Sequence, residues 1–214
     1  MQNFTFKRHF LSVVFLLLGC VAIKAADDGL ITEQITVNLE KAGTLPNKIS
    51  DAEKYKITNL KVVGDINGDD IRFIRDMGGQ SFERKVTDGK LSKLDLSEAK
   101  IVEGGDHYYV TGDNVYYSTV NHVLGYGTFA RCGSLKSILL PSDITSIEKA
   151  AFLECGVTSL TVPLGVTSIG EYAFYDCDSL ESITLLWLRG ARCTHLCLLG
   201  NRLSEIRLLQ CSRR

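Results

Sequence analysis

The chain has 214 residues, of which 45% are hydrophobic and 23% are charged, a composition that is ordinary for a globular protein. This length is enough for one sizeable domain or for a short array of repeats. The formal net charge of −1 gives no overall attraction to nucleic acid or to an anionic membrane, so we expect no nucleic-acid partner.

The first residues have the pattern of an export signal. Residues 7–9 are basic and residues 10–18 form an apolar run, which is too short to span a bilayer because a transmembrane helix needs about 20 residues. We therefore predict that residues 1–25 are a signal peptide and that the protein is secreted or held at the cell surface.

Two ways of processing this signal are open. Leu17-Leu18-Gly19-Cys20 resembles a lipobox, in which Cys20 would become a lipidated N-terminus and provide the protein's contact with a membrane. Alternatively, a signal peptidase cleaves near Ala25 or Ala26, where small residues precede two aspartates.

Residues 30–90 combine a strand-like segment with the start of a helix. Ile57, Leu60 and Val62 have the spacing of a strand, and residues 64–67 make a turn. Two aspartates then precede the apolar residues of the segment 71–77, a pattern typical of a short helix with acidic residues at its start. We interpret residues 30–90 as a small α+β N-terminal cap, which shields the apolar end of a stack of repeats.

A calcium loop is the alternative interpretation of the same turn. Oxygen-bearing side chains stand at positions 1, 3, 5 and 12 of such a loop, namely at Asp65, Asn67, Asp69 and Asp76. However, Asp70 occupies the position that needs a glycine, and Arg72 replaces the usual apolar residue. We favour the turn and helix start, and assign no metal and no other cofactor.

Residues 91–120 lead into the repeats. Leu91, Leu94 and Leu96 have leucine-rich strand spacing, whereas residues 103–120 are rich in glycine and tyrosine. We predict an expanded loop for residues 103–120. Its tyrosines either contact a partner or pack locally, and the sequence leaves both interpretations open.

A repeat of about 23 residues dominates the following segment. Phenylalanine recurs at positions 129, 152 and 174, and cysteine recurs with the same steps at positions 132, 155 and 177. A unit of this length cannot enclose a core of its own, so its apolar face is buried by the next unit. We therefore predict that Phe129, Phe152 and Phe174 line a shared interior, with leucine-rich repeats over residues 91–185.

Each repeat also contains one short strand with alternating side chains. Ile138 and Leu140 point inward, while Ser137 and Leu139 point outward. Stacked units place these strands side by side in a parallel sheet. The outward positions then form a ladder, which we take as the candidate binding face: Lys93, Asp95, Ser137, Leu139, Ser159, Thr161, Ser182 and Thr184.

The repeated cysteines are interpreted as buried thiols that act as compact apolar residues. Each unit supplies only one sulfur atom and no histidine partner. The segment Cys193-x-His195-x-Cys197 has zinc-ligand types, but no second ligand pair of recognisable spacing follows it. We predict no metal site and no catalytic residues.

The pattern Ile-Gly-x-x-Ala-Phe-x-x-Cys-x-Ser-Leu-x-x-Ile-x-Leu resembles the BspA-like leucine-rich repeats of bacterial surface proteins, most specifically over residues 124–185. The resemblance implies an α/β solenoid with short parallel strands. It also implies an exported, non-enzymatic protein that mediates adhesion or protein–protein interaction with extracellular or host proteins. The alternative is a cell-envelope enzyme or glycan-binding accessory with its site in residues 30–120.

Residues 186–214 differ in composition from the rest of the chain. They contain six arginines, three cysteines and one acidic residue, a net charge of +5, against −6 for residues 1–185. We interpret this aberrant basic tail as the product of a shifted reading frame that truncates a longer array. An atypical capping repeat and a basic segment that contacts an acidic partner are the alternatives.

Overall fold

The computed structural model describes residues 29–187, 192–193 and 205–210. The predicted signal peptide, with Cys20, lies outside these residues, as do His195 and Cys197 of the zinc alternative. Within the described ranges, no helix is long and apolar enough to cross a membrane.

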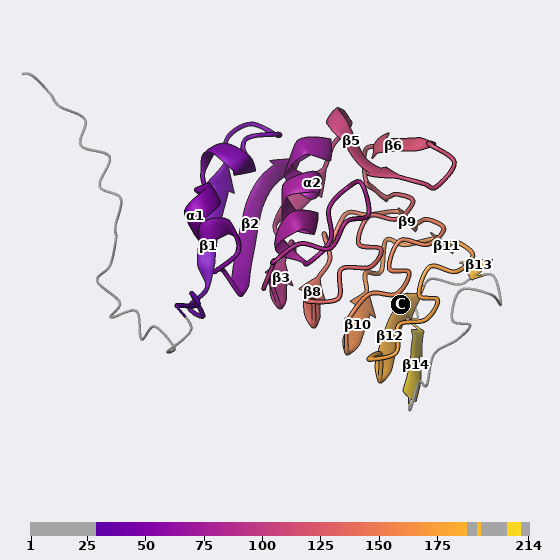
Figure 1. Cartoon of the computed structure of the whole chain (residues 1–214). Coiled ribbons are helices and arrows are strands. Elements are labelled where there is room, and N and C mark those ends of the chain that lie inside the picture. Colours follow the sequence, from indigo (N-terminus) through magenta and orange to yellow (C-terminus); the bar gives the residue numbers. More distant parts are fainter. Residues whose placement is uncertain (1–28, 188–191, 194–204, 211–214) are drawn as a thin grey trace, which may run out of the picture.

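Most strands belong to one parallel sheet, in which they follow one another in chain order (Figure 1). The strands in this order are β1 (Ile35–Leu39), β2 (Asn59–Ile66), β3 (Lys93–Asp95), β8 (Ser137–Leu139), β10 (Ser159–Val162), β12 (Ser182–Trp187) and β14 (Glu205–Gln210). A further strand, β4 (Ala99–Ile101), pairs with β2. All neighbours in this sheet are parallel, which confirms the predicted arrangement of short parallel strands.

A second parallel sheet holds the other short strand of each repeat. Its strands are β7 (Val123–Leu124), β9 (Ser146–Ile147), β11 (Ser168–Ile169) and β13 (Arg192–Cys193). Leu124 pairs with Ile147, and Ile147 pairs with Ile169. These side chains and the inward residues of the main sheet belong to one core cluster, so each repeat contributes one strand to each sheet and side chains to a common interior.

The repeated phenylalanines form the centre of this interior. Phe129, Phe152 and Phe174 are fully buried, and their ring centroids lie 5.7 Å and 5.2 Å apart. Burial of each ring contributes about 1.5–3 kcal/mol. The predicted shared interior is therefore confirmed, because the Phe152 ring packs against the rings of both neighbouring repeats.

Left-handed residues shape the turn around each of these rings. The residue two places before the phenylalanine has a positive φ in all three repeats (Gly127, Ala150 and Tyr172), and so does the residue before the cysteine (Arg131, Glu154 and Asp176). Such a conformation costs an ordinary residue about 1–2 kcal/mol. Hydrogen bonds between repeats offset this cost, since Phe129 N–H donates to Ala151 O and Phe152 N–H donates to Ala173 O, both at 2.7 Å.

The repeated cysteines are buried free thiols, as predicted. Two of them bond to the preceding repeat: the Cys155 thiol donates to Cys132 O at 3.5 Å, and the Cys177 thiol donates to Phe152 O at 2.9 Å. Burial raises the pKa of Cys132 to about 11 and the pKa of Cys177 to about 12. The thiols therefore remain protonated and packed at neutral pH.

The two short strands described in the basic tail continue both sheets. Strand β14 pairs with β12 in parallel, with Ser182 beside Glu205 and Ile183 beside Ile206. Strand β13 extends the second sheet beside β11. The backbone thus keeps the repeat spacing beyond Leu185, and the frame-shift interpretation of residues 186–214 stays a prediction.

Residues before the first repeat contribute two helices that lie beside the sheet (Figure 1). Helix α1 (Asp51–Lys54) and a 3₁₀ turn (η1, Leu45–Asn47) precede β2, and helix α2 (Gly68–Met77) follows it. The Asn67 side chain accepts a hydrogen bond from Asp69 N–H at 3.0 Å and caps α2. The predicted turn and helix start are therefore confirmed.

A buried arginine connects helix α2 to the first phenylalanine turn. The Arg75 side chain is fully buried, and its guanidinium donates to Gly127 O at 2.7 Å, Thr128 O at 2.9 Å and Ala130 O at 3.3 Å. It also lies 4.9 Å from the centroid of the Tyr109 ring. Carbonyl oxygens rather than a carboxylate therefore hold this charge, and they belong to the turn that carries Phe129.

Residues 103–120 form a hairpin, so the prediction of an expanded loop is wrong. Strands β5 (Gly104–Val110) and β6 (Tyr116–Thr119) pair in antiparallel fashion. The turn between them is closed by a hydrogen bond from Thr111 N–H to Val115 O at 2.9 Å. Aromatic residues favour such strands, and this preference outweighs the glycines that suggested a loop.

Most tyrosines of this region pack locally. The rings of Tyr117 and Tyr126 stack with centroids 4.3 Å apart, and Tyr109 lies 5.8 Å from Tyr126. Tyr108 is buried, and its hydroxyl donates to Tyr126 O at 3.1 Å. Tyr116 differs, because 53% of it is exposed.

We expect Arg75→Met to lower the free energy of unfolding by about 3 kcal/mol or more, because it leaves several buried carbonyl groups without a donor. Arg72→Met is the matched control on the same helix, since the ion pair of Arg72 with Asp106 and its stacking on Phe82 each contribute at most about 1 kcal/mol. Urea unfolding of both variants measures the difference. Equal losses for the two variants would show that Arg75 does not hold the first turn.

We also expect stability to fall as the pH rises from 9 to 11. Unfolded thiols lose their protons near the ordinary pKa of 9.0, whereas burial keeps Cys132 protonated to about pH 11, so the unfolded state binds fewer protons in this range. Cys132→Ala should make the decline shallower by up to about 1.4 kcal/mol per pH unit. Urea unfolding at several pH values tests this, with the four non-repeat cysteines replaced by serine. An unchanged slope would contradict the role of the thiol.

Candidate functional site

The predicted binding positions lie side by side on one face of the main sheet. Ser137 pairs with Lys93 and with Ser159, which in turn pairs with Ser182. One row further along the strands, Asp95 pairs with Leu139 and Thr161 pairs with Thr184. We call these two rows the strand face. They consist of Lys93, Asp95, Ser137, Leu139, Ser159, Thr161, Ser182 and Thr184.

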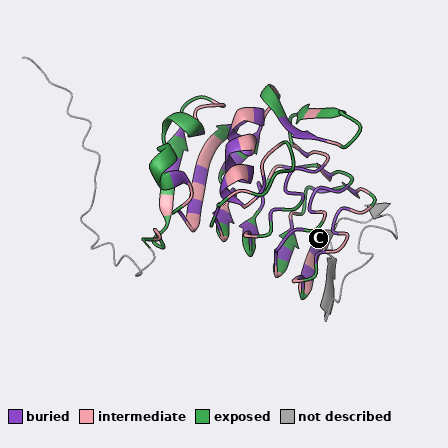
Figure 2. Ribbon diagram, viewed as in Figure 1, coloured by how far each residue is buried: buried purple, intermediate pink, exposed green. Residues whose placement is uncertain are grey.

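The alternation of side chains along each strand explains this placement. Ile138, Leu160 and Ile183 are buried, and the neighbours of each in sequence therefore point to the opposite side of the sheet. Figure 2 shows the result as exposed positions that alternate with buried ones along the strands. The structure thus brings all eight predicted residues onto a common surface.

Exposure varies along the strand face. Lys93, Ser137, Ser159 and Thr161 are exposed, and Ser182 and Thr184 are half-buried. Leu139 is 52% exposed, although leucine is normally buried. The strand face therefore presents one exposed apolar side chain among small polar ones.

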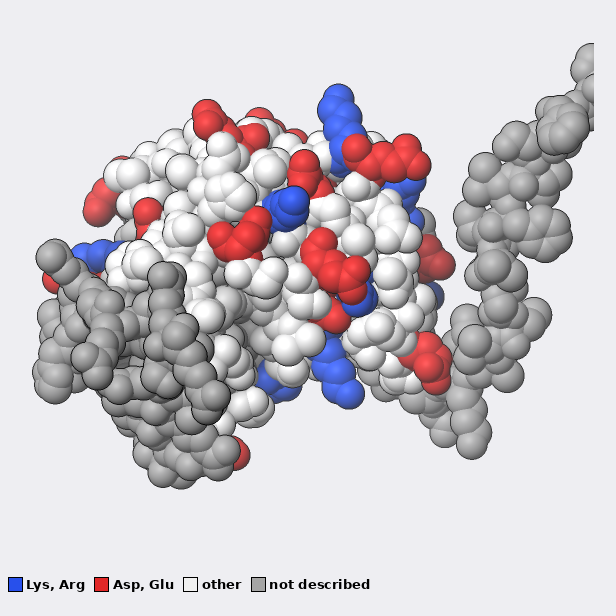
Figure 3. Space-filling view, turned by 180° about the vertical axis from the view of Figure 1, so that it is seen from behind, with Lys and Arg blue, Asp and Glu red and all other residues white. Residues whose placement is uncertain are grey.

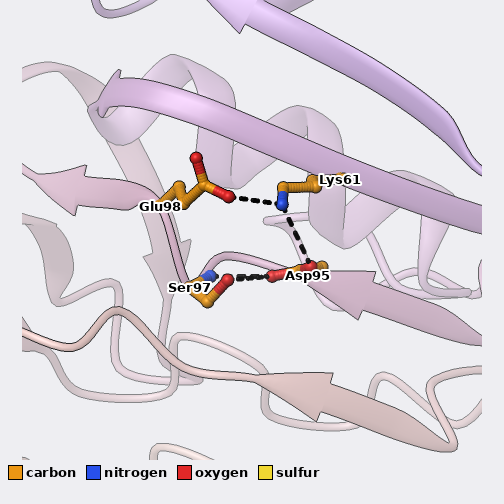
Figure 4. A network of polar contacts seen from close by, with 4 residues as sticks. All are labelled: Lys61, Asp95, Ser97 and Glu98. Carbon is orange, nitrogen blue, oxygen red and sulfur yellow. Dashed lines mark hydrogen bonds and ion pairs between the residues drawn. The ribbon is translucent and has the colours of Figure 1, made fainter.

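Asp95 is the member of the strand face whose side chain is engaged within the protein (Figure 4). Its carboxylate accepts hydrogen bonds from Ser97 N–H at 2.9 Å and from Ser97 O–H at 2.6 Å, and it lies 3.8 Å from Lys61 Nζ. Partial burial raises the pKa of Asp95, but the bonds from Ser97 and the charge of Lys61 outweigh it and lower the pKa overall. Asp95 therefore stays ionised and holds the end of its strand.

Lys61 extends this network across the sheet. Its ammonium group also contacts Glu98 Oε1 at 2.5 Å, and this hydrogen bond raises the pKa of Lys61. The pairing of Lys61 with Asp95 in neighbouring strands places the three charges together. The network fixes one end of the strand face. Lys93 is the charged residue of the strand face that forms no ion pair with any described residue.

The residues of the calcium alternative have other partners. Asp69 accepts a hydrogen bond from Asp106 N–H at 3.1 Å, and Asp76 pairs with Lys54 at 2.7 Å. Asn67 caps helix α2, and Asp65 is exposed. No group of three or more His, Cys, Asp or Glu side chains that could hold a metal ion occurs among the described residues.

Asp70 has the structural role that the calcium interpretation did not foresee. It is fully buried and accepts hydrogen bonds from Gly43 N–H at 2.6 Å, Leu45 N–H at 2.9 Å and Asn67 N–H at 3.0 Å. Its burial raises the pKa, which these bonds partly counteract. The carboxylate therefore joins the loop before η1 to the start of α2.

Two histidine contacts were not predicted from the sequence. His107 Nδ1 lies 2.8 Å from Ser118 Oγ on the hairpin, and His122 Nδ1 lies 2.9 Å from Asp143 Oδ2. A nucleophilic site needs a base that is itself oriented by a third group. In the described part of the chain, neither imidazole ring contacts both a hydroxyl group and a carboxylate.

Charged side chains of both signs are scattered over the side of the molecule opposite to that of Figure 1 (Figure 3). Wide uncharged areas separate them. Among the described residues, this side therefore shows no broad basic surface of the kind that nucleic acid requires.

Comparison with known proteins identifies the repeat. Residues 114–189 match the family model described as BspA type leucine rich repeat region, in six copies. No curated protein matches the chain.

A solved structure of a leucine-rich cell surface protein from Faecalibacterium prausnitzii A2-165 is 20% identical over 70% of this chain, with a TM-score of 0.34. The match covers 38% of that protein, so the present chain corresponds to well under two thirds of its length.

Proposed function

Because residues 114–189 are BspA-type leucine-rich repeats, we propose that the protein is a non-enzymatic binding protein. It contacts other proteins through the strand face and mediates interaction or adhesion at the bacterial surface. The observation that supports this most is the alignment of outward side chains in register across β3, β8, β10 and β12.

The strand face suits a protein partner for two physical reasons. Its backbone is fixed by the ladder of the parallel sheet, so little conformational entropy is lost when a partner binds. Leu139 provides an exposed apolar contact, and Ser137, Ser159 and Thr161 provide small polar groups beside it. The face is narrow, so strong attachment requires several copies that bind together.

In this proposal the repeats stack as a solenoid, and residues 30–90 cap its N-terminal end. Arg75 supports the capping role, because it connects α2 to the turn that carries Phe129. The main sheet also continues from the repeats into β2 and β1. The cap would shield side chains of the first repeat that would otherwise face water.

Export is part of the same proposal. The basic and apolar pattern of residues 1–25 supports secretion, with Cys20 as the site of a lipid anchor or with simple cleavage near Ala25. The partners are then extracellular or host proteins. Any membrane contact is made through the lipid.

A second candidate function is that of a glycan-binding accessory or cell-envelope enzyme with a site in residues 30–120. A polar cavity beside the hairpin favours the glycan-binding form of this candidate. The enzyme form has less support, because His107 and Ser118 lack a carboxylate that would orient the imidazole among the described residues.

We expect Ser159→Arg combined with Thr161→Arg to weaken binding of a captured extracellular partner by about tenfold or more, because two large charged side chains would cover the centre of the strand face. The partner is captured on the immobilised mature chain, and its affinity is then measured for each variant. Ser142→Arg is the control, since Ser142 is exposed in the turn after β8. Unchanged binding by the double variant, or an equal loss with the control, would contradict the proposed face.

A further inference from the structure

A cavity of about 480 Å³ lies beside the β5–β6 hairpin, away from the strand face. Helix α2, the turn at residues 81–85 and the hairpin all contribute to it. Its charged lining residues are two arginines, Arg72 and Arg84, and two carboxylates, Glu83 and Asp106. Phe82, His107, Asn114 and Tyr116 also line it. This volume falls within the range of about 300–1,000 Å³ that is typical of small-molecule sites.

One wall of the cavity is held in place by stacking and hydrogen bonds. The Arg72 guanidinium lies 3.6 Å from the centroid of the Phe82 ring and donates to Asp106 Oδ2 at 3.1 Å. Val110 N–H donates to Phe82 O at 3.3 Å, which joins the turn to β5. Arg72 and Asp106 therefore neutralise each other, and contacts within the protein hold this wall in place without a ligand.

Arg84 supplies a positive charge that forms no ion pair with any described residue. The neighbouring Glu83 pairs with Lys85 at 2.5 Å, and this hydrogen bond lowers the pKa of Glu83. The Arg84 guanidinium is exposed and has no ion pair with any described residue. A planar guanidinium with free donors binds carboxylates in a bidentate manner.

Further polar groups at the cavity are available to a ligand. The Nδ1 atom of His107 is occupied by Ser118, which leaves Nε2 without a protein partner among the described residues. Asn114 stands in the hairpin turn with an exposed side chain. Imidazole and amide groups are donors and acceptors that can bond to hydroxyl groups.

Tyr116 adds an aromatic surface to this polar set. It is 53% exposed, and its ring lies 5.1 Å from the His107 ring at an angle of 43°. The histidine therefore restricts the orientation of the tyrosine. An exposed ring beside hydroxyl-binding groups can cover the apolar face of a sugar ring, since its own face is apolar and its hydroxyl is polar.

We propose that this cavity binds an acidic saccharide, with the carboxylate of a uronic acid residue on Arg84 and the sugar ring against Tyr116. The polar lining favours a sugar over an apolar molecule. This inference deepens the glycan-binding candidate. It is independent of protein binding by the strand face.

Calorimetric titration of the full chain with trigalacturonic acid and with its methyl ester tests the charge recognition. The ester keeps the sugar rings and removes the negative charges. We expect the acid to bind about tenfold or more tightly than the ester, because a charge-assisted hydrogen bond is lost. Equal affinities, or no binding of the acid at millimolar concentrations, would overturn the proposal.

Variants locate the site. Arg84→Asn removes the guanidinium and suits the left-handed backbone, where φ is 66°. This variant and Tyr116→Ala should each weaken binding of the acid by about tenfold. Lys93→Asn removes one positive charge from the strand face and should leave saccharide binding unchanged. Far-UV circular dichroism checks that each variant is folded.

The outcomes separate this inference from the proposed protein binding. If Arg84→Asn retains full affinity for the acid, the cavity is not the saccharide site. If an acidic peptide of aspartate and glutamate binds in an Arg84-dependent manner and the saccharide does not, the ligand class is wrong. Arg84→Asn should leave binding of a strand-face partner unchanged, so failure of one proposal does not imply failure of the other.

Discussion

A repeat of 22 or 23 residues is too short to bury its own apolar side chains, and the structure meets this constraint by sharing the interior between neighbours. Phe152 illustrates it most directly, because its ring contacts both Phe129 and Phe174. The backbone hydrogen bonds between consecutive turns, and the hydrogen bonds donated by the Cys155 and Cys177 thiols, also run from one repeat to its neighbour. Regular packing inside therefore produces regular spacing outside, and the strand face is its consequence.

The sequence predicted those parts of the fold that depend on residue type at a fixed spacing. The buried rings, the buried thiols and the start of α2 belong to this class. The left-handed conformations of Ala150 and Tyr172 do not, because these residues carry no signal for positive φ. The hairpin was missed because its glycines suggested a loop, while the packing of Tyr109 on its neighbours depends on distant contacts.

The two candidate sites differ in how well the sequence alone could predict them. The strand face follows from alternation along a strand, so its residues could be named in advance. The cavity joins a helix, a turn and a hairpin that are separated along the chain, and no spacing pattern connects Arg72 with Tyr116. The burial of Arg75 was equally inaccessible, because its partners are backbone carbonyls rather than residues of opposite charge.

A double-mutant cycle on Phe152 and Phe174 tests the shared interior most directly. The free energies of unfolding of Phe152→Leu, Phe174→Leu and the double variant are measured in urea, with Phe73→Leu combined with Phe152→Leu as a control pair. Stacked rings in adjacent repeats predict a coupling energy of about 0.5–1.5 kcal/mol for Phe152 and Phe174, and additive losses for the control pair. Losses at Phe152 and Phe174 that add to within about 0.3 kcal/mol would contradict a shared interior.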